Sequence, residues 1–162
     1  MTTTTSAPTP SAMPAHRATL TITVGAPGAG KSTWAHAHAA ATGAAVIGRD
    51  AIREHLFGTD YLCQTPIRAR EERVTSLQRA LVAEQLSQGR DVIVDDTNAL
   101  PGIRASWERF ATAQHALFRT RRFNVPLEVA LERNARRQRR VPDDVVRDYH
   151  RALQRQEEAT PR

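Results

Sequence analysis

Residues 25–32 carry the pattern that most restricts how this chain can fold. They read G-A-P-G-A-G-K-S and match the spacing G-x-x-x-x-G-K-S/T in full. Before them, residues 20–24 alternate threonine with Leu, Ile and Val, as a buried strand does. After them, residues 31–42 are mostly alanine, and Gly43 can close that helix in the left-handed conformation. A glycine-rich turn between a strand and a helix N-terminus predicts a phosphate-binding loop.

In a loop of this kind, successive backbone N–H groups surround the β-phosphate of a nucleoside triphosphate, and the helix N-terminus adds partial positive charge. We expect Lys31 to reach the β- and γ-phosphates and Ser32 to bind Mg²⁺. Trp34 is predicted to be a core residue and not a platform for a nucleobase. The expected nucleotide-binding residues of the loop are Gly25, Ala26, Pro27, Gly28, Ala29, Gly30, Lys31, Ser32 and Thr33.

The rest of the chain alternates short apolar runs with helical patterns. The predicted strands cover residues 20–24, 44–47, 92–94 and 116–123, and the arginines of the last suit a sheet edge. The predicted helices cover residues 31–42, 51–57, 65–89 and the segments that begin at Pro101, at Pro126 and after Pro142. This order predicts an α/β domain of three layers, with a parallel sheet of four to five strands between helices. Ligands of such sheets bind at the carboxyl ends of the strands.

With 162 residues, the chain is long enough for one domain with a core. We expect residues 1–16 to be a disordered N-terminal tail, residues 17–157 to form the domain and residues 158–162 to be a C-terminal tail. No apolar run reaches the roughly 18 residues of a membrane helix, and the N-terminus lacks the pattern of a secretory signal. Cys63 is the only cysteine, which favours a cytoplasmic protein without internal disulfides.

The chain is basic, with a net charge of +6 and a pI near 10.8. Lys31 is its only lysine, and arginine provides the other 22 basic residues, a bias that GC-rich codon usage alone can explain. The distribution is more informative. Residues 119–140 hold eight arginines and two glutamates, a local excess of six. Focused basicity of this kind indicates an acidic partner, of which nucleic acid is the most common.

Carboxylates follow two of the predicted strands directly. Asp50 stands in G-R-D-A-I-R after residues 44–47, and Asp95 and Asp96 stand in V-I-V-D-D-T-N. At the carboxyl edge of the sheet, such a group can accept the proton of an attacking hydroxyl or hold the metal ion, effects worth roughly 10²- to 10⁴-fold in rate. The structural alternative is a helix N-cap. For Asp50 we favour the catalytic interpretation, whereas the residues alone do not decide between Asp95 and Asp96.

Arginines dominate the helix predicted to begin at Pro126. Arg133 and Arg137 are four residues apart, as are Arg136 and Arg140, so each pair would share one helical face. One of these stripes is predicted to fold over the triphosphate as a lid, where guanidinium groups stabilise charge in the transition state. A solvated basic face is the alternative, and the phosphate-binding loop favours the lid.

Strings along the chain, in order from about Leu20 to Leu153, resemble the 5′-kinase domain of polynucleotide kinase from T-even bacteriophages. They read L-T-I-T-V-G-A-P-G-A-G-K-S-T-W-A, G-R-D-A-I-R, V-I-V-D-D-T-N, W-E-R-F-A, N-V-P-L-E-V-A-L-E-R-N-A-R-R and V-P-D-D-V-V-R. The later strings are much more specific than the phosphate-binding loop. The resemblance implies an adenylate-kinase-like phosphate-loop kinase fold with an arginine-rich helical lid. It also implies transfer of the γ-phosphate of ATP, with Mg²⁺, to the 5′-hydroxyl end of DNA or RNA.

On the acceptor side, the resemblance implies that Asp50 is the general base for the 5′-hydroxyl. Arg53 would orient this base or contact a phosphate of the acceptor. Asp96 corresponds to the second essential carboxylate of the family, which selects it over Asp95. On the donor side, Lys31 and Ser32 hold the triphosphate and the metal. Arg137 matches the lid arginine of the family, which would contact the donor phosphates. Arg133 and Asn134 match the same lid motif less closely.

The sequence departs from the phage pattern in three places. Gly48 stands where the phage enzyme has a larger polar side chain, and residues 56–73, which help to shape the acceptor channel, diverge. The chain is also too short to contain the C-terminal phosphatase domain of the phage enzyme, so no 3′-phosphatase activity is expected. The identity of the acceptor is therefore a separate question. The first alternative to a polynucleotide end is the hydroxyl of a small molecule, a nucleoside or a hydroxymethylated base. A nucleotide-binding switch without phosphotransfer is the second, and Asp50, Asp96 and Arg137 argue against it.

Overall fold

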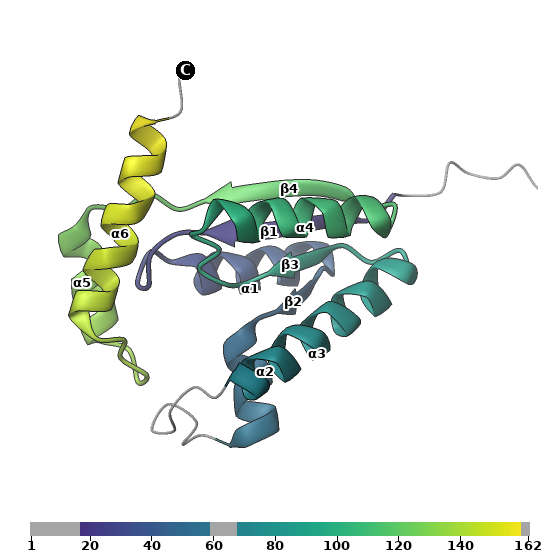
Figure 1. Cartoon of the computed structure of the whole chain (residues 1–162), viewed down its shortest axis with the longest axis horizontal. Helices are drawn as coiled ribbons and strands as arrows, with labels where there is room; N and C mark the ends of the chain where they lie inside the picture. The colour runs from purple at the N-terminus through teal and green to yellow at the C-terminus, as the bar shows by residue number, and fades with distance from the viewer. Residues whose placement is uncertain (1–16, 59–67, 160–162) are drawn as a thin grey trace, which may run out of the picture.

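A computed structural model describes residues 17–58 and 68–159 of the chain. Four strands form one parallel sheet in the order β2-β3-β1-β4. They span Thr19–Val24 (β1), Ala45–Ile47 (β2), Val92–Val94 (β3) and Leu117–Arg122 (β4). The predicted α/β architecture is confirmed, as is the position of the arginine-bearing strand at an edge (Figure 1).

Helices connect the strands and cover both faces of the sheet. They span Lys31–Thr42 (α1), Arg49–Phe57 (α2), Arg68–Ser87 (α3), Pro101–Ala113 (α4), Leu127–Ala135 (α5) and Asp143–Glu158 (α6). The connection from β1 to β2 contains α1, and the connections from β2 to β3 and from β3 to β4 contain α3 and α4 and run across the sheet in the opposite direction. Because crossovers between parallel strands are right-handed, α1 lies on one face of the sheet, and α3 and α4 lie on the other. The pair α5 and α6 lies beyond the carboxyl ends of β1 and β4 (Figure 1).

The core lies between the two central strands and the helices α3 and α4. Leu20 and Ile22 of β1 are fully buried, and so are the flanking valines of β3, the strand predicted to be buried on both sides. From the helices, Val82 of α3 and Trp107 of α4 pack against them. Burial of each large aliphatic side chain stabilises the fold by roughly 1.5–3 kcal/mol. The core therefore fixes the carboxyl ends of β1 and β3, where the predicted site residues lie.

Most predicted helix ends are confirmed. Gly43 and Gly58 close α1 and α2 with positive φ angles of 77° and 79°, and Pro101 opens α4. The predicted start of α3 at Thr65, the N-terminal tail and Cys63 lie outside the described residues. Within the described ranges, none of the helices combines the length and the apolarity needed to cross a membrane.

The prediction that Trp34 belongs to the core is wrong. Its ring is half-buried, stacks on His38 at a centroid distance of 4.9 Å and meets Phe123 edge-on at 5.7 Å. The guanidinium of Arg121 lies 5.6 Å above it. Ala35 is the one buried residue of α1, so Trp34 covers the exposed end of β4 instead of entering the core.

The predicted arginine stripes are also wrong, because α5 ends at Ala135. Arg136, Arg137 and Arg140 follow in a loop that leads to Pro142 and α6. The buried side chain of Asn134 causes this ending: its Nδ2 donates to Val141 O at 2.7 Å, and its Oδ1 accepts from Val141 N at 3.1 Å. These two hydrogen bonds close the loop, so residues four apart no longer share a helical face.

Candidate active site

The phosphate-binding loop connects β1 to α1 at the carboxyl edge of the sheet. Gly28 and Gly30 adopt left-handed conformations with φ angles of 82° and 94°, which side chains rarely tolerate. A Cβ atom at Gly28 would also lie 2.1 Å from Ala130 O of α5. The loop therefore needs this glycine for its own shape and for direct packing of α5.

Lys31 turns back over the loop. Its Nζ donates to the carbonyl oxygens of Gly25 and Ala26, both at 2.9 Å. Burial lowers the pKa of the Lys31 ammonium to about 8, the nearby carboxylate of Asp95 opposes that shift, and Arg137 adds to it. A desolvated ammonium beside a cradle of backbone N–H groups is suited to an anion with several oxygens. The residues of the loop thus fit a triphosphate.

The pKa of Lys31 makes nucleotide affinity dependent on pH. A bound triphosphate favours the charged ammonium, so binding above about pH 8 requires uptake of a proton. We expect ATP affinity to be level between pH 7 and 8 and then to fall by up to about tenfold per pH unit. The terminal phosphate is fully ionised in this range, because its last pKa is roughly 6. Titration of ATP binding at each pH measures the effect.

Lys31→Arg is the control for this pH dependence, because its guanidinium stays charged throughout the range. Its ATP affinity should not change between pH 8 and 9.5. An equal decline in Lys31→Arg would show that another group causes the effect.

One cleft of about 710 Å³ opens beside the loop and connects the donor and acceptor sides. It brings together predicted site residues from the phosphate-binding loop, α1, α2, the segment after β3 and the loop after α5. Those that line it are Pro27, Lys31, Ser32, Asp50, Arg53, Asp96 and Arg137, together with Asp95. Arg133 is not part of the cleft lining. It lies beside the phosphate-binding loop, because a Cβ atom added at Gly30 would be 3.5 Å from the Nη1 of Arg133.

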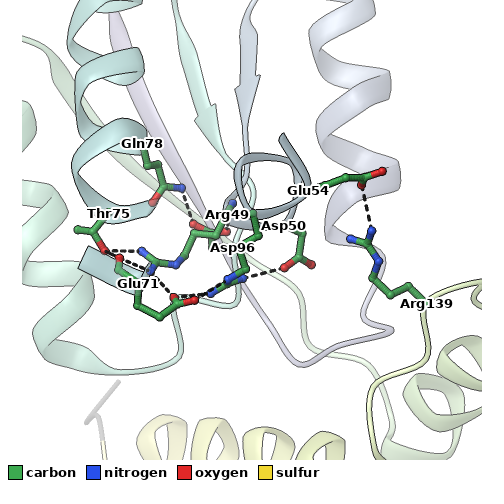
Figure 2. Close-up of polar contacts among 9 residues, drawn as sticks. Arg49, Asp50, Glu54, Glu71, Thr75, Gln78, Asp96 and Arg139 are labelled. Atoms are coloured by element: carbon green, nitrogen blue, oxygen red, sulfur yellow. Dashed lines mark hydrogen bonds and ion pairs between the residues drawn. The ribbon is translucent and has the colours of Figure 1, made fainter. Parts of the chain in front are cut away.

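Asp50 is not a helix cap. The N-cap of α2 is Gly48, and Asp50 follows in the first turn with its side chain 67% exposed. Its Oδ1 accepts a hydrogen bond from Arg53 Nη1 at 2.8 Å (Figure 2). The capping alternative is therefore wrong. An accessible carboxylate oriented by a neighbouring guanidinium has the arrangement that a general base requires.

Asp96 has a different environment, because the residue is half-buried and both of its carboxylate oxygens accept hydrogen bonds. Its Oδ1 accepts from Arg49 N at 2.9 Å, and its Oδ2 accepts from Gln78 Nε2 at 2.6 Å (Figure 2). Burial raises the pKa of the Asp96 carboxyl, and the two hydrogen bonds act against that rise. Asp96 thus joins the end of β3 to α2 and α3. Asp95 is the carboxylate that most raises the pKa of Lys31, so it lies towards the donor side.

Glu71 of α3 organises the arginines of α2, a role the sequence did not suggest. Its carboxylate binds Arg53 through two contacts of 2.9 Å and 2.8 Å and binds Arg49 Nη2 at 2.7 Å (Figure 2). Arg49 also donates to Thr75 Oγ1 at 2.9 Å. The hydrogen bond from Arg53 is the main reason that the pKa of Glu71 falls to about 2. Glu71 therefore stays charged and holds Arg53 against Asp50.

We predict that Glu71→Gln lowers turnover roughly 10- to 100-fold, because misplacement of Arg53 disturbs Asp50. The variant keeps the size of the side chain but loses the charge that both arginines share. ATP affinity should stay nearly unchanged, since Glu71 does not contact the loop. Glu72→Gln is the matched control, because Glu72 pairs with the exposed Arg68 of the same helix. Equal turnover of the two variants would contradict a positioning role for Glu71.

The loop after α5 reaches across the cleft to α2. Arg137 lines the cleft, and Arg139 forms an ion pair with Glu54 of α2 at 3.0 Å (Figure 2). The loop thus connects the end of α5 to α2 at the cleft, and its arginines lie on irregular backbone. In the segment after β3, Asn98 has a positive φ of 43°, and its Nδ2 donates to Thr23 O at 2.9 Å. This hydrogen bond attaches the segment to β1.

Comparisons with known proteins agree with this architecture. Residues 20–157 match the AAA domain family. A bifunctional polynucleotide kinase/RNA ligase of Autographa californica nuclear polyhedrosis virus is 31% identical over 132 residues, which cover 76% of this chain and 19% of that protein. The L-seryl-tRNA(Sec) kinase of Methanococcus maripaludis is 28% identical over 134 residues, which cover 81% of this chain and 51% of that protein. The chain thus spans about a fifth and about half of these two relatives.

A solved structure has the same fold over most of this chain. A chain of the Pnkp1/Rnl/Hen1 RNA repair complex superimposes with a TM-score of 0.78 and 26% identity, and the match covers 90% of this chain and 47% of that one. The parallel sheet, the loop and the crossovers are those of a nucleotide-binding phosphate-loop kinase fold. Because the family match extends over nearly all of the described residues, the chain belongs to the AAA domain family.

Proposed function

We propose that the protein is an ATP-dependent polynucleotide 5′-hydroxyl kinase, which transfers the γ-phosphate of ATP to the 5′-hydroxyl end of DNA or RNA. The observation that carries the proposal is the shared cleft: Lys31 of the donor loop and Asp50, held by Arg53, line the same 710 Å³ space. The relatives named polynucleotide kinase/RNA ligase and Pnkp1 support this choice of acceptor.

In this proposal the loop and Lys31 hold the triphosphate, and Ser32 binds Mg²⁺, which neutralises charge on the phosphates when bound. Among the described residues, no group of three or more His, Cys, Asp or Glu side chains is placed to hold a metal alone. This agrees with Mg²⁺ sites that use few protein ligands and complete their coordination with phosphate oxygens and water. Asp95, the carboxylate that most raises the pKa of Lys31, is the one that we propose to complement Ser32.

Asp50 accepts the proton of the 5′-hydroxyl while the oxygen of that hydroxyl forms a bond to the γ-phosphorus. The bond from the γ-phosphorus to the bridging oxygen breaks, and ADP leaves. Arg53 keeps the Asp50 carboxylate oriented, and in this proposal it also contacts a phosphate of the acceptor. Arg137, and Arg133 beside the loop, supply positive charge to the phosphates in the transition state.

Acceptor class is the part of the proposal that needs the most direct test. The L-seryl-tRNA(Sec) kinase of Methanococcus maripaludis acts, by its name, on a seryl-tRNA, so kinases of this type differ in the hydroxyl they use. The excess of six positive charges in residues 119–140 favours a polyanionic acceptor over a small neutral one.

The test incubates the protein with γ-labelled ATP, Mg²⁺ and a panel of 5′-hydroxyl oligonucleotides, nucleosides and sugars, and identifies the labelled product. Only the oligonucleotides should be labelled efficiently. Their binding should weaken with salt, with a log–log slope of roughly −0.7 for each phosphate contact. Preferential labelling of a sugar or nucleoside, with a flat salt response, would overturn the choice of acceptor.

A further inference from the structure

The cleft extends beyond the Asp50 cluster into a space between α3, α4 and α6, to which the proposed reaction assigns no role. Arg79 lines this part of the cleft, one helical turn beyond Thr75, which contacts Arg49. Four residues of helix correspond to a rise of about 6 Å. Arg79 is therefore close to the acceptor-side cluster but separate from it.

The surroundings of Arg79 hold its guanidinium in place without neutralising it. Its Nη2 donates to Ser106 Oγ at 2.6 Å, and the group lies 5.3 Å above the Trp107 ring and 5.2 Å from the Phe110 ring. Within residues 17–58 and 68–159, no carboxylate forms an ion pair with Arg79. By contrast, Arg49 and Arg53 share the carboxylate of Glu71. The cleft thus contains a fixed positive charge that is available to an anion.

Exposed apolar side chains line the same cleft as Arg79. Four large hydrophobic residues are exposed in the described part of the chain, and three of them line this cleft. They are Leu100, Ile103 and Tyr149, with exposed fractions of 57%, 42% and 37%. Between the first two, a Cβ at Gly102 would have no atom within 4 Å, so the wall is open there. Exposed apolar groups gathered at one cleft are typical of a binding surface.

We propose that this space binds the second nucleotide of a single-stranded acceptor, with Arg79 on the 3′-phosphate of that nucleotide and Leu100, Ile103 and Tyr149 against its base. The proposal rests on the proposed polynucleotide kinase function and adds a determinant of acceptor length. A guanidinium provides paired N–H donors for phosphate oxygens. Apolar and aromatic side chains bind the faces of unstacked bases without demanding a sequence. A nucleoside or sugar acceptor would use neither feature.

The test compares two acceptors, a nucleoside 3′-phosphate and a 5′-hydroxyl trinucleotide. In the wild type, the trinucleotide should have the lower KM. Arg79→Gln should raise the KM for the trinucleotide roughly tenfold, leave the KM for the nucleoside 3′-phosphate and for ATP unchanged, and reduce the salt slope by about 0.7. Ile103→Ser should also raise only the trinucleotide KM. Arg73→Gln is the matched control, since Arg73 lies on the same helix over the Phe57 ring.

The outcomes separate this inference from the function on which it rests. If the wild type labels neither acceptor, the kinase proposal itself fails. If it labels both with the same KM, or if Arg79→Gln changes both acceptors equally, the second-nucleotide site is refuted while the kinase function stands. Arg79→Lys covers the case in which Arg79→Gln does not fold: it keeps the charge and should retain the preference for the trinucleotide.

Discussion

Lys31→Ala should remove nearly all phosphotransfer, by at least roughly 10²- to 10³-fold, and leave the fold intact. The Nζ of Lys31 lies 2.9 Å from two carbonyl oxygens of the loop. In the proposed mechanism its charge stabilises the transferring phosphoryl group, and its ammonium makes no contribution to the hydrophobic core. Single-turnover transfer from γ-labelled ATP measures the loss.

Thermal unfolding provides the control for Lys31→Ala. The variant loses two hydrogen bonds to backbone carbonyls, worth about 0.5–1.5 kcal/mol each, but it no longer buries an ammonium whose pKa is lowered by burial. Its melting temperature should therefore remain close to that of the wild type. Near-normal phosphotransfer by a folded Lys31→Ala protein would rule out the role of Lys31 at the transferring phosphoryl group.

Asp50→Asn should lower turnover by roughly 10²-fold or more while ATP affinity changes little. Asparagine keeps the size of the side chain and can still accept a hydrogen bond from Arg53, but it cannot take the proton of the acceptor. Since Gly48 and not Asp50 is the N-cap of α2, the substitution should not affect helix stability. The measurements are single-turnover phosphorylation and equilibrium binding of ATP.

Glu72→Gln is the matched control for Asp50→Asn, because Glu72 is not part of the cleft lining and pairs with the exposed Arg68. It should retain most of the turnover. An Asp50→Asn enzyme that is as active as Glu72→Gln would refute the general-base assignment.

The parts of the fold that local sequence determines were predictable. The glycine pattern of residues 25–32 is specific for a phosphate-binding loop between a parallel strand and a helix N-terminus. Gly43 and Pro101 mark helix ends by their own backbone preferences. The arginines of β4 correctly indicated an edge strand. In each case the physical cause lies within a few residues of the observed structure.

Features that depend on distant contacts were not predictable. The end of α5 depends on hydrogen bonds between Asn134 and Val141, which a helical pattern cannot reveal. Trp34 is only half-buried because its ring contacts Arg121 and Phe123 at the end of β4 and not the core.

The acceptor side shows the same limit. Glu71 lies in the segment that diverges from the phage pattern, so no motif pointed to it. The spacing of Glu71, Thr75 and Gln78 along α3 is a polar stripe that indicates a shared face. Only the structure shows that this face meets Arg49, Arg53 and Asp96. The direction in which a polar stripe points is a property of tertiary packing.

The most direct test of the central claim uses two oligonucleotides of identical sequence, one with a 5′-hydroxyl and one with a 5′-phosphate. Each is incubated with the protein, γ-labelled ATP and Mg²⁺, and the position of the label is determined by digestion to nucleotides. We predict that only the 5′-hydroxyl oligonucleotide becomes labelled, and only on its terminal 5′-oxygen. Absence of label from both, or equal labelling of both, would contradict a polynucleotide 5′-hydroxyl kinase.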